Sequence, residues 1–109
     1  MTRHLAALAL ALLPLAAEAQ EFTTTTWTCE RGVEIPVTIV AGAAEVAVLN
    51  VEGRQITLVR EEAAAGARFG WPSDGSHYVW WEQDGTADLS WVDGALGEEV
   101  TLLHGCEPL

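Results

Sequence analysis

After residue 20 the chain consists of short runs in which apolar and polar residues alternate. Between residues 33 and 39 every second residue is Val or Ile, and Glu, Pro and Thr stand between them. This period of two is typical of a strand that is buried on one face. The pattern predicts strands at residues 23–29, 33–39, 44–49, 54–60, 76–82, 86–92 and 98–104. Pro36 has no N–H for a strand ladder, so we expect it at an edge or a bulge.

The segments between these strands carry turn signals. Asp84-Gly85 and Asp93-Gly94 separate the last three strands, and Asp-Gly is a strong hairpin signal. Residues 61–67 begin with Glu-Glu-Ala-Ala-Ala, which has helical propensity, but Gly66 ends the run and a loop or single turn is expected. Residues 70–75 include a proline and two glycines and are predicted as a loop. Seven or eight short strands at this spacing predict an all-β domain, either an antiparallel barrel or a sandwich.

The first residues have the features of a secretory signal peptide. Arg3 and His4 precede an apolar run from Leu5 to Leu15, and Ala17-Glu18-Ala19 offers small residues at both positions that a signal peptidase reads. The run is about half of the ~20 residues that a membrane-spanning helix needs. We therefore expect a signal peptide at residues 1–19 and a mature domain at residues 20–109. No cysteine closely follows the run, so a soluble periplasmic or secreted protein is expected rather than a lipoprotein.

Two cysteines, Cys29 and Cys106, lie near the two ends of the expected mature domain. Small exported domains often depend on disulfides, because their cores are modest. Only one pairing is possible within the chain, and it would stabilise the fold by about 4–5 kcal/mol in the chain-entropy model. Two free thiols or a metal site are the alternatives. Export disfavours free thiols, and two isolated cysteines are a poor metal signal.

The charge balance is strongly acidic. The expected mature domain has four arginines and no lysine against fifteen carboxylates, a formal net charge of −11. Binding to nucleic acid or to anionic lipid through charge is therefore excluded. Such a surface favours association with a basic partner, although acidity also simply keeps an exported protein soluble.

Catalytic and metal-binding patterns are missing from the sequence. Ser73, Asp74, Ser76 and His77 are close neighbours, but they lack the Gly-x-Ser-x-Gly turn of a nucleophile, and triads are assembled from distant segments. His77 and His104 are too isolated to indicate zinc. We expect no enzymatic activity, no cofactor and no metal.

Five tryptophans are many for a small domain. Trp80 and Trp81 are adjacent in a predicted strand, so their side chains must face opposite sides. We expect core or barrel-end positions for Trp27 and Trp91. Trp71 stands in the predicted loop, where it is either a packing residue or a binding anchor.

Four short motifs resemble the family of membrane-bound and periplasmic inhibitors of c-type lysozyme. Trp27-Thr28-Cys29 is similar to the Tyr-x-Cys that opens the family's domain, and Ala65-Gly66-Ala67-Arg68-Phe69 to its Ser-Gly-Ala-Arg-Tyr segment. Tyr78-Val79-Trp80-Trp81 is similar to the Tyr-x-x-Trp strand, and Cys106 to the closing cysteine. The resemblance implies an eight-stranded antiparallel β-barrel closed by one disulfide.

The resemblance also implies a mechanism, in which a loop enters the lysozyme cleft and donates hydrogen bonds to the catalytic carboxylates. The implied lysozyme-contacting positions are Ala65, Gly66, Ala67, Arg68, Phe69 and Gln83. Ala65 replaces the family serine, Gln83 replaces the family lysine, and residues 70–75 form an enlarged loop between these positions. We expect Arg68 to tie the loop to the barrel.

Two hypotheses of function follow. The first is a periplasmic inhibitor that blocks the cleft of c-type lysozyme, a basic partner. The second is a retained barrel that binds another envelope component or a small ligand without inhibiting lysozyme, and the altered loop and the tryptophans favour it. For a purely structural envelope protein the sequence offers no positive sign.

Overall fold

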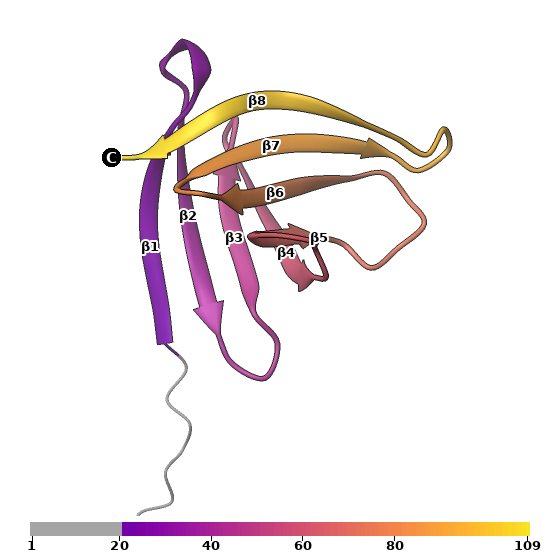
Figure 1. Cartoon of the computed structure of the whole chain (residues 1–109), viewed down its shortest axis with the longest axis horizontal. Helices are drawn as coiled ribbons and strands as arrows, with labels where there is room; N and C mark the ends of the chain where they lie inside the picture. Colours follow the sequence, from indigo (N-terminus) through magenta and orange to yellow (C-terminus); the bar gives the residue numbers. More distant parts are fainter. Residues whose placement is uncertain (1–20) are drawn as a thin grey trace, which may run out of the picture.

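A computed structural model describes residues 21–109, so the predicted signal peptide at 1–19 and the start of the mature chain at Gln20 lie outside the described residues. The described chain forms eight strands and one short 3₁₀ helix (Figure 1). They are β1 (Glu21–Thr28), η1 (Glu30–Gly32), β2 (Glu34–Ala41), β3 (Val46–Val51), β4 (Arg54–Glu61), β5 (Ala67–Gly70), β6 (His77–Gln83), β7 (Thr86–Asp93) and β8 (Glu98–Pro108). No helix in this part of the chain has the length and hydrophobicity to cross a membrane.

Each strand pairs antiparallel with the next along the chain, and β1 pairs with β8 to close the barrel. In Figure 1 β1 and β2 run steeply, and β6, β7 and β8 cross them, as the tilted walls of a small barrel do. The closure is short, with Trp27 opposite Pro108 and Thr28 opposite Glu107. The predicted all-β class and the eight-stranded antiparallel barrel are confirmed.

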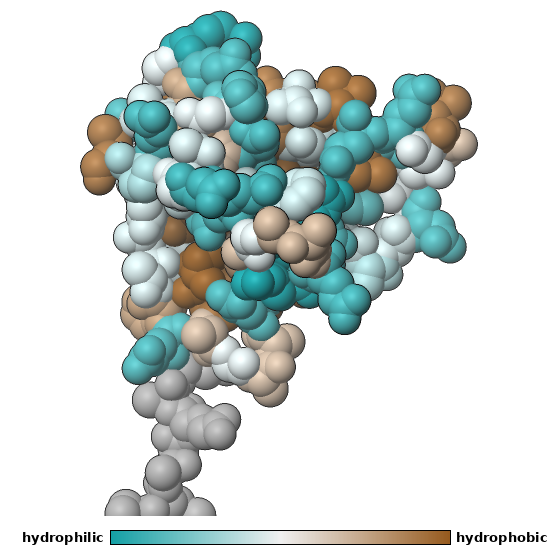
Figure 2. Space-filling model, viewed as in Figure 1, coloured by the Kyte–Doolittle hydropathy of each residue, from teal (hydrophilic) through white to brown (hydrophobic). Residues whose placement is uncertain are grey.

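The alternation of residues along the strands places the core inside the barrel. The fully buried side chains include Ile35, Val37, Leu49, Leu58 and Leu89. Trp27 and Trp80 pack edge to face at the centre, with ring centroids 5.4 Å apart. Trp81 faces outward, as the prediction of opposite faces for the two adjacent tryptophans requires. On the face shown in Figure 2, hydrophilic residues are interspersed with smaller hydrophobic patches.

The predicted disulfide between Cys29 and Cys106 is present, with an S–S distance of 2.01 Å. Cys29 directly follows β1 and Cys106 lies in β8, so the bond stands beside the only two residue pairs that join these strands. The disulfide therefore holds the shortest seam of the barrel together.

The structure contains one strand that the sequence pattern did not predict. The pattern placed residue 67 in one loop and residue 70 in the next and predicted no strand between them, but residues 67–70 form β5, which pairs with β4 and β6. A strand of four residues that ends in glycine is too short to show alternation. The hairpin predicted at Asp93-Gly94 is present, with a turn over residues 94–97 in which the Asp93 carboxylate accepts hydrogen bonds from the N–H groups of Ala95 and Leu96.

Pro36 lies where one side of β2 is open. It pairs with Thr26 of β1, but the pairing of β2 with β3 begins only at Val37. The missing N–H of Pro36 therefore interrupts no ladder on the β3 side, which agrees with its predicted edge position.

The up-and-down order of the strands gathers the turns at two ends of the barrel. The Ala65 end holds the β2–β3 turn, the β4–β5 loop (residues 62–66) and the β6–β7 turn. The Arg31 end holds η1, the β3–β4 turn, the β5–β6 loop (residues 71–76) and the β7–β8 turn. The N–H of Gly94 donates to the Ser76 hydroxyl at 3.0 Å, which joins the last two of these.

Candidate functional site

The structure brings together the two segments that the sequence analysis selected. The β4–β5 loop passes directly over the end of β6, because Gly66 has no side chain there. A Cβ on Gly66 would overlap the carbonyl oxygen of Glu82 and lie 2.8 Å from the Cγ of Gln83. Gly66 also has a φ of +68°, which glycine adopts without cost. Ala65 and Gln83 therefore belong to one surface at the Ala65 end.

Two side chains fix the backbone of this loop. The indole N–H of Trp81 donates a hydrogen bond to the carbonyl oxygen of Ala65 at 2.9 Å. Arg60 donates to the carbonyl oxygen of Gly66 at 3.3 Å and forms an ion pair with Glu45 at 2.9 Å. The loop is thus held by side chains of β4 and β6, although its own residues 62–66 are exposed.

Arg68 ties the loop to the outer wall of the barrel. Its Nε donates to Glu61 at 2.7 Å, and its terminal nitrogens donate to both oxygens of Glu99, at 2.6 and 3.4 Å. Its guanidinium lies over the Trp81 ring, 4.9 Å from the centroid. Burial by itself would lower the pKa of Arg68, but the hydrogen bonds and charges of Glu99 and Glu61 outweigh it and raise the pKa. Arg68 is committed to these partners, so the geometry supports the expected tying role.

The six predicted contact positions differ in what they present to a partner. Ala65 and Gly66 are exposed, and Gln83 is half-buried. Ala67 is half-buried inside β5, and the side chain of Phe69 is only 1% exposed in the core. The accessible part of the set is therefore Ala65, Gly66 and Gln83. The loop is anchored by the start of β5, which consists of Ala67, Arg68 and Phe69.

The enlarged loop does not separate the two segments. Residues 71–76 lie at the Arg31 end, whereas Ala65 and Gln83 lie at the Ala65 end. Residues 66 and 83 are in contact in spite of the longer connection between them. The residues of this loop therefore belong to the opposite end of the barrel.

Glu82 gives the site an unusual carboxylate. Its side chain is partly buried, and its oxygen accepts a hydrogen bond from the indole N–H of Trp80 at 3.3 Å. Burial raises the pKa of Glu82, the Trp80 hydrogen bond offsets part of the shift, Glu45 adds to it and Arg60 opposes it. Gln83 thus follows a carboxylate that resists ionisation.

Three residues of the site were missed by sequence reasoning. Trp81 belongs to the Tyr-x-x-Trp motif and was expected on the face opposite Trp80, but its hydrogen bond to the loop was not predicted, and Glu61 and Glu99 carried no signal as partners of Arg68. The available hint for Trp81 was its position. It is the exposed neighbour of the core residue Trp80, and Arg68 lies one strand away. Glu99 comes from β8, and no local pattern could have paired it with β5.

The fold and this site define a small, disulfide-closed antiparallel barrel that presents a fixed loop beside a hairpin turn at one end. The family model described as membrane-bound lysozyme-inhibitor of c-type lysozyme matches residues 27–96, which is more than half of the chain. The chain belongs to this family, and the resemblance found in its motifs is confirmed. Comparison with curated proteins finds no match.

Proposed function

We propose that this protein inhibits c-type lysozyme by placing the β4–β5 loop and the β6–β7 turn in the active-site cleft of the enzyme. The observation that carries the proposal is the contact of Gly66 with Glu82 and Gln83, which puts both segments on one exposed surface. Family membership supports the target, since the family is one of lysozyme inhibitors. The function is binding, and the proposal includes no catalysis by this chain.

The chemistry of the proposed contact follows from the lysozyme cleft, where two carboxylates perform the reaction. Backbone N–H groups of the exposed loop and the side-chain amide of Gln83 are the donors available to them. Hydrogen bonds to an ionised carboxylate are the strong ones. Ala65 has no hydroxyl and Gln83 has no charge, so we propose that inhibition is weaker than a serine and a lysine at these positions would give.

The loop is suited to this role because it is fixed before binding. Trp81 and Arg60 hold the carbonyl groups of Ala65 and Gly66, and Arg68 holds the strand that follows. A preorganised loop loses little conformational entropy when it enters a cleft. The net charge of −11 supports association with a basic enzyme, mainly through the rate of encounter.

We also propose that the protein acts in the cell envelope as a soluble domain. The family description names a membrane-bound inhibitor. Here the first cysteine of the chain, Cys29, is bonded to Cys106 and is not available for a lipid. Removal of residues 1–19 would then release residues 20–109 to the periplasm or the exterior. N-terminal sequencing and mass measurement of protein from the envelope fraction test this point.

The test of inhibition is a turbidity assay, in which c-type lysozyme clears a suspension of bacterial cell walls. We expect the purified domain to slow the clearing and to be retained on immobilised lysozyme. Retention without inhibition would place the contact outside the cleft. Neither retention nor inhibition would favour the second hypothesis, a retained barrel with another ligand.

A further inference from the structure

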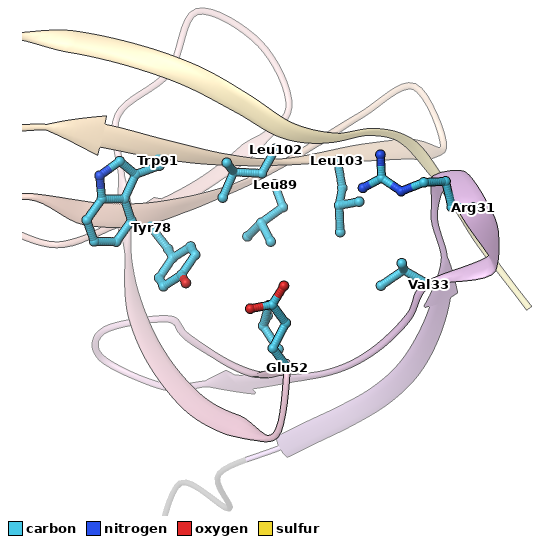
Figure 3. Close-up of a pocket in the computed structure, with 9 residues that line it drawn as sticks. Arg31, Val33, Glu52, Tyr78, Leu89, Trp91, Leu102 and Leu103 are labelled. Atoms are coloured by element: carbon cyan, nitrogen blue, oxygen red, sulfur yellow. The ribbon is translucent and has the colours of Figure 1, made fainter.

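The Arg31 end of the barrel, opposite the proposed inhibitory surface, contains a half-open pocket of about 560 Å³. Figure 3 shows it with its lining residues. Leu89 and Leu103 form an apolar floor and Val33 one wall, while Tyr78 and Trp91 pack edge to face 4.8 Å apart on another. A volume of 300–1,000 Å³ with mainly apolar walls is typical of small-molecule sites.

Two charged side chains point into this pocket from different sides, Arg31 from η1 and Glu52 from the β3–β4 turn (Figure 3). Within residues 21–109 neither side chain forms a hydrogen bond or an ion pair with the protein. Among the other arginines of residues 21–109, Arg60 and Arg68 are paired with carboxylates, and Arg54 lies outside the pocket without a side-chain partner. Arg31 and Glu52 are exposed, so solvent reaches both groups in the free protein. The pocket therefore carries one cation and one anion whose hydrogen-bonding capacity is left for another molecule.

Arg31 and Glu52 both lie in tight turns. Their φ values are +58° and +50°, and the glycine that follows each of them, Gly32 or Gly53, also has a positive φ. Glu52-Gly53 is the two-residue turn between β3 and β4, of the same form as Asp84-Gly85, and this conformation is ordinary in such a turn. The two turns border the pocket, and their charged residues line it.

We propose that this pocket binds a small zwitterion with an apolar body, of the class of an apolar amino acid or a short peptide. Its carboxylate faces Arg31, its ammonium faces Glu52, and its side chain packs on Leu89 and Leu103. A zwitterion satisfies both charges at once. A plain anion would be repelled by Glu52 and by the net charge of −11, and a plain cation would be repelled by Arg31.

The site is independent of lysozyme inhibition, because it lies at the other end of the barrel and shares no residue with the Ala65 end.

The experiment is isothermal titration of the full domain with L-phenylalanine, with the dipeptide Phe-Phe, and with two analogues that lack one charge, N-acetylphenylalanine and phenethylamine. We expect a zwitterion to bind at least about tenfold more tightly than the singly charged analogues, since each lost partner leaves a charge unpaired. Comparison of the amino acid with the dipeptide identifies which length spans the two charges.

Variants then assign the contacts. Arg31→Gln and Glu52→Gln should each weaken the binding of the zwitterion by about tenfold or more. Arg54→Gln and Glu34→Gln are the matched controls, since they remove the same charges from exposed strand residues outside the pocket lining, and they should bind as the wild type does. Circular dichroism and lysozyme inhibition should be unchanged in all four. Equal affinity for the zwitterion and its analogues, affinity unchanged by Arg31→Gln and Glu52→Gln, or no binding of either zwitterion, would overturn the proposal.

Discussion

The indole N–H of Trp81 and the carbonyl oxygen of Ala65 are joined by a hydrogen bond of 2.9 Å. Trp81 is an outward-facing residue of β6, and Ala65 is in the β4–β5 loop, so the bond crosses over β5. One face of the indole is covered by the Arg68 guanidinium, which two carboxylates hold in place. The position of the loop thus depends on a stack of side chains that comes from β4, β5, β6 and β8.

Trp81→Phe removes the donor but keeps an aromatic ring for Arg68. We expect a loss of stability of about 1 kcal/mol and an inhibition constant raised by up to about tenfold, because the Ala65 carbonyl loses its partner and the loop its fixed position. Denaturant unfolding and the turbidity assay measure the two effects. Trp71→Phe is the control, since Trp71 is 46% exposed at the other end of the barrel. Equal inhibition by the two variants would show that the Trp81 bond does not position the loop.

Glu82→Gln should stabilise the protein in a pH-dependent way. The pKa of Glu82 is raised above its ordinary value of 4.5, mainly by burial. Between the ordinary and the raised pKa the folded state binds more protons than the unfolded state, so the free energy of unfolding falls as the pH rises through that window. The neutral amide accepts the Trp80 hydrogen bond without this cost.

We therefore expect the stability advantage of Glu82→Gln to be small at about pH 4 and larger at about pH 7. Urea unfolding at both pH values measures it. Glu62→Gln, an exposed residue of the loop, removes the same charge and controls for net charge. The same pH dependence in both variants would mean that general charge repulsion, and not the burial of Glu82, is responsible.

Periodicity predicted most of the fold because seven strands are long enough to show alternation. It failed at β5, whose four residues are specified by pairing with β4 and β6 rather than by their own pattern. The pairing of the disulfide could be predicted from the number of cysteines alone, because two cysteines allow only one pairing within the chain. The partners of Arg68 could not be predicted, since Glu99 is brought near by the closure of the barrel. The pocket at the Arg31 end was hidden for the same reason, because its lining comes from segments spread along the chain from residue 31 to residue 103.

Association with lysozyme should slow as salt is added. The net charge of −11 on this chain attracts a basic enzyme, and the Debye length falls from about 30 Å at 0.01 M to about 8 Å at 0.15 M salt. The effect should appear in the association rate more than in the dissociation rate. Surface plasmon resonance over this range separates the two rates. An association rate that does not change with salt would show that the acidity serves solubility alone.

Replacement of Cys29 and Cys106 by alanine should cost about 4–5 kcal/mol of stability, since the bond closes a long loop in the unfolded chain. The two cysteines are 77 residues apart and stand beside the only pairs between β1 and β8. Urea unfolding of the variant, compared with the wild type before and after reduction, measures the loss. Reduced wild type and the variant should agree. A loss well below 1 kcal/mol in both would mean that the β1–β8 seam holds without the bond.

The exposed surface at the Ala65 end allows its proposed role to be strengthened by substitution. Ala65→Ser adds a hydroxyl donor and Gln83→Lys adds a charged one, and both positions are on the side of the site open to a partner. A hydrogen bond that involves an ionised group contributes about 1.5–3 kcal/mol where water is excluded, which is about tenfold or more in affinity for each site.

Because Gly66 fixes the distance between the two segments, the two donors should approach neighbouring carboxylates of the cleft and their effects should couple. The turbidity assay with the wild type, both single variants and the double variant measures this. Glu62→Lys supplies the control, since it adds a positive charge to an exposed residue of the same loop and should weaken the attraction of a basic enzyme. Potent inhibition by the wild type that none of the substitutions at 65 and 83 changes would mean that another surface of the barrel binds lysozyme.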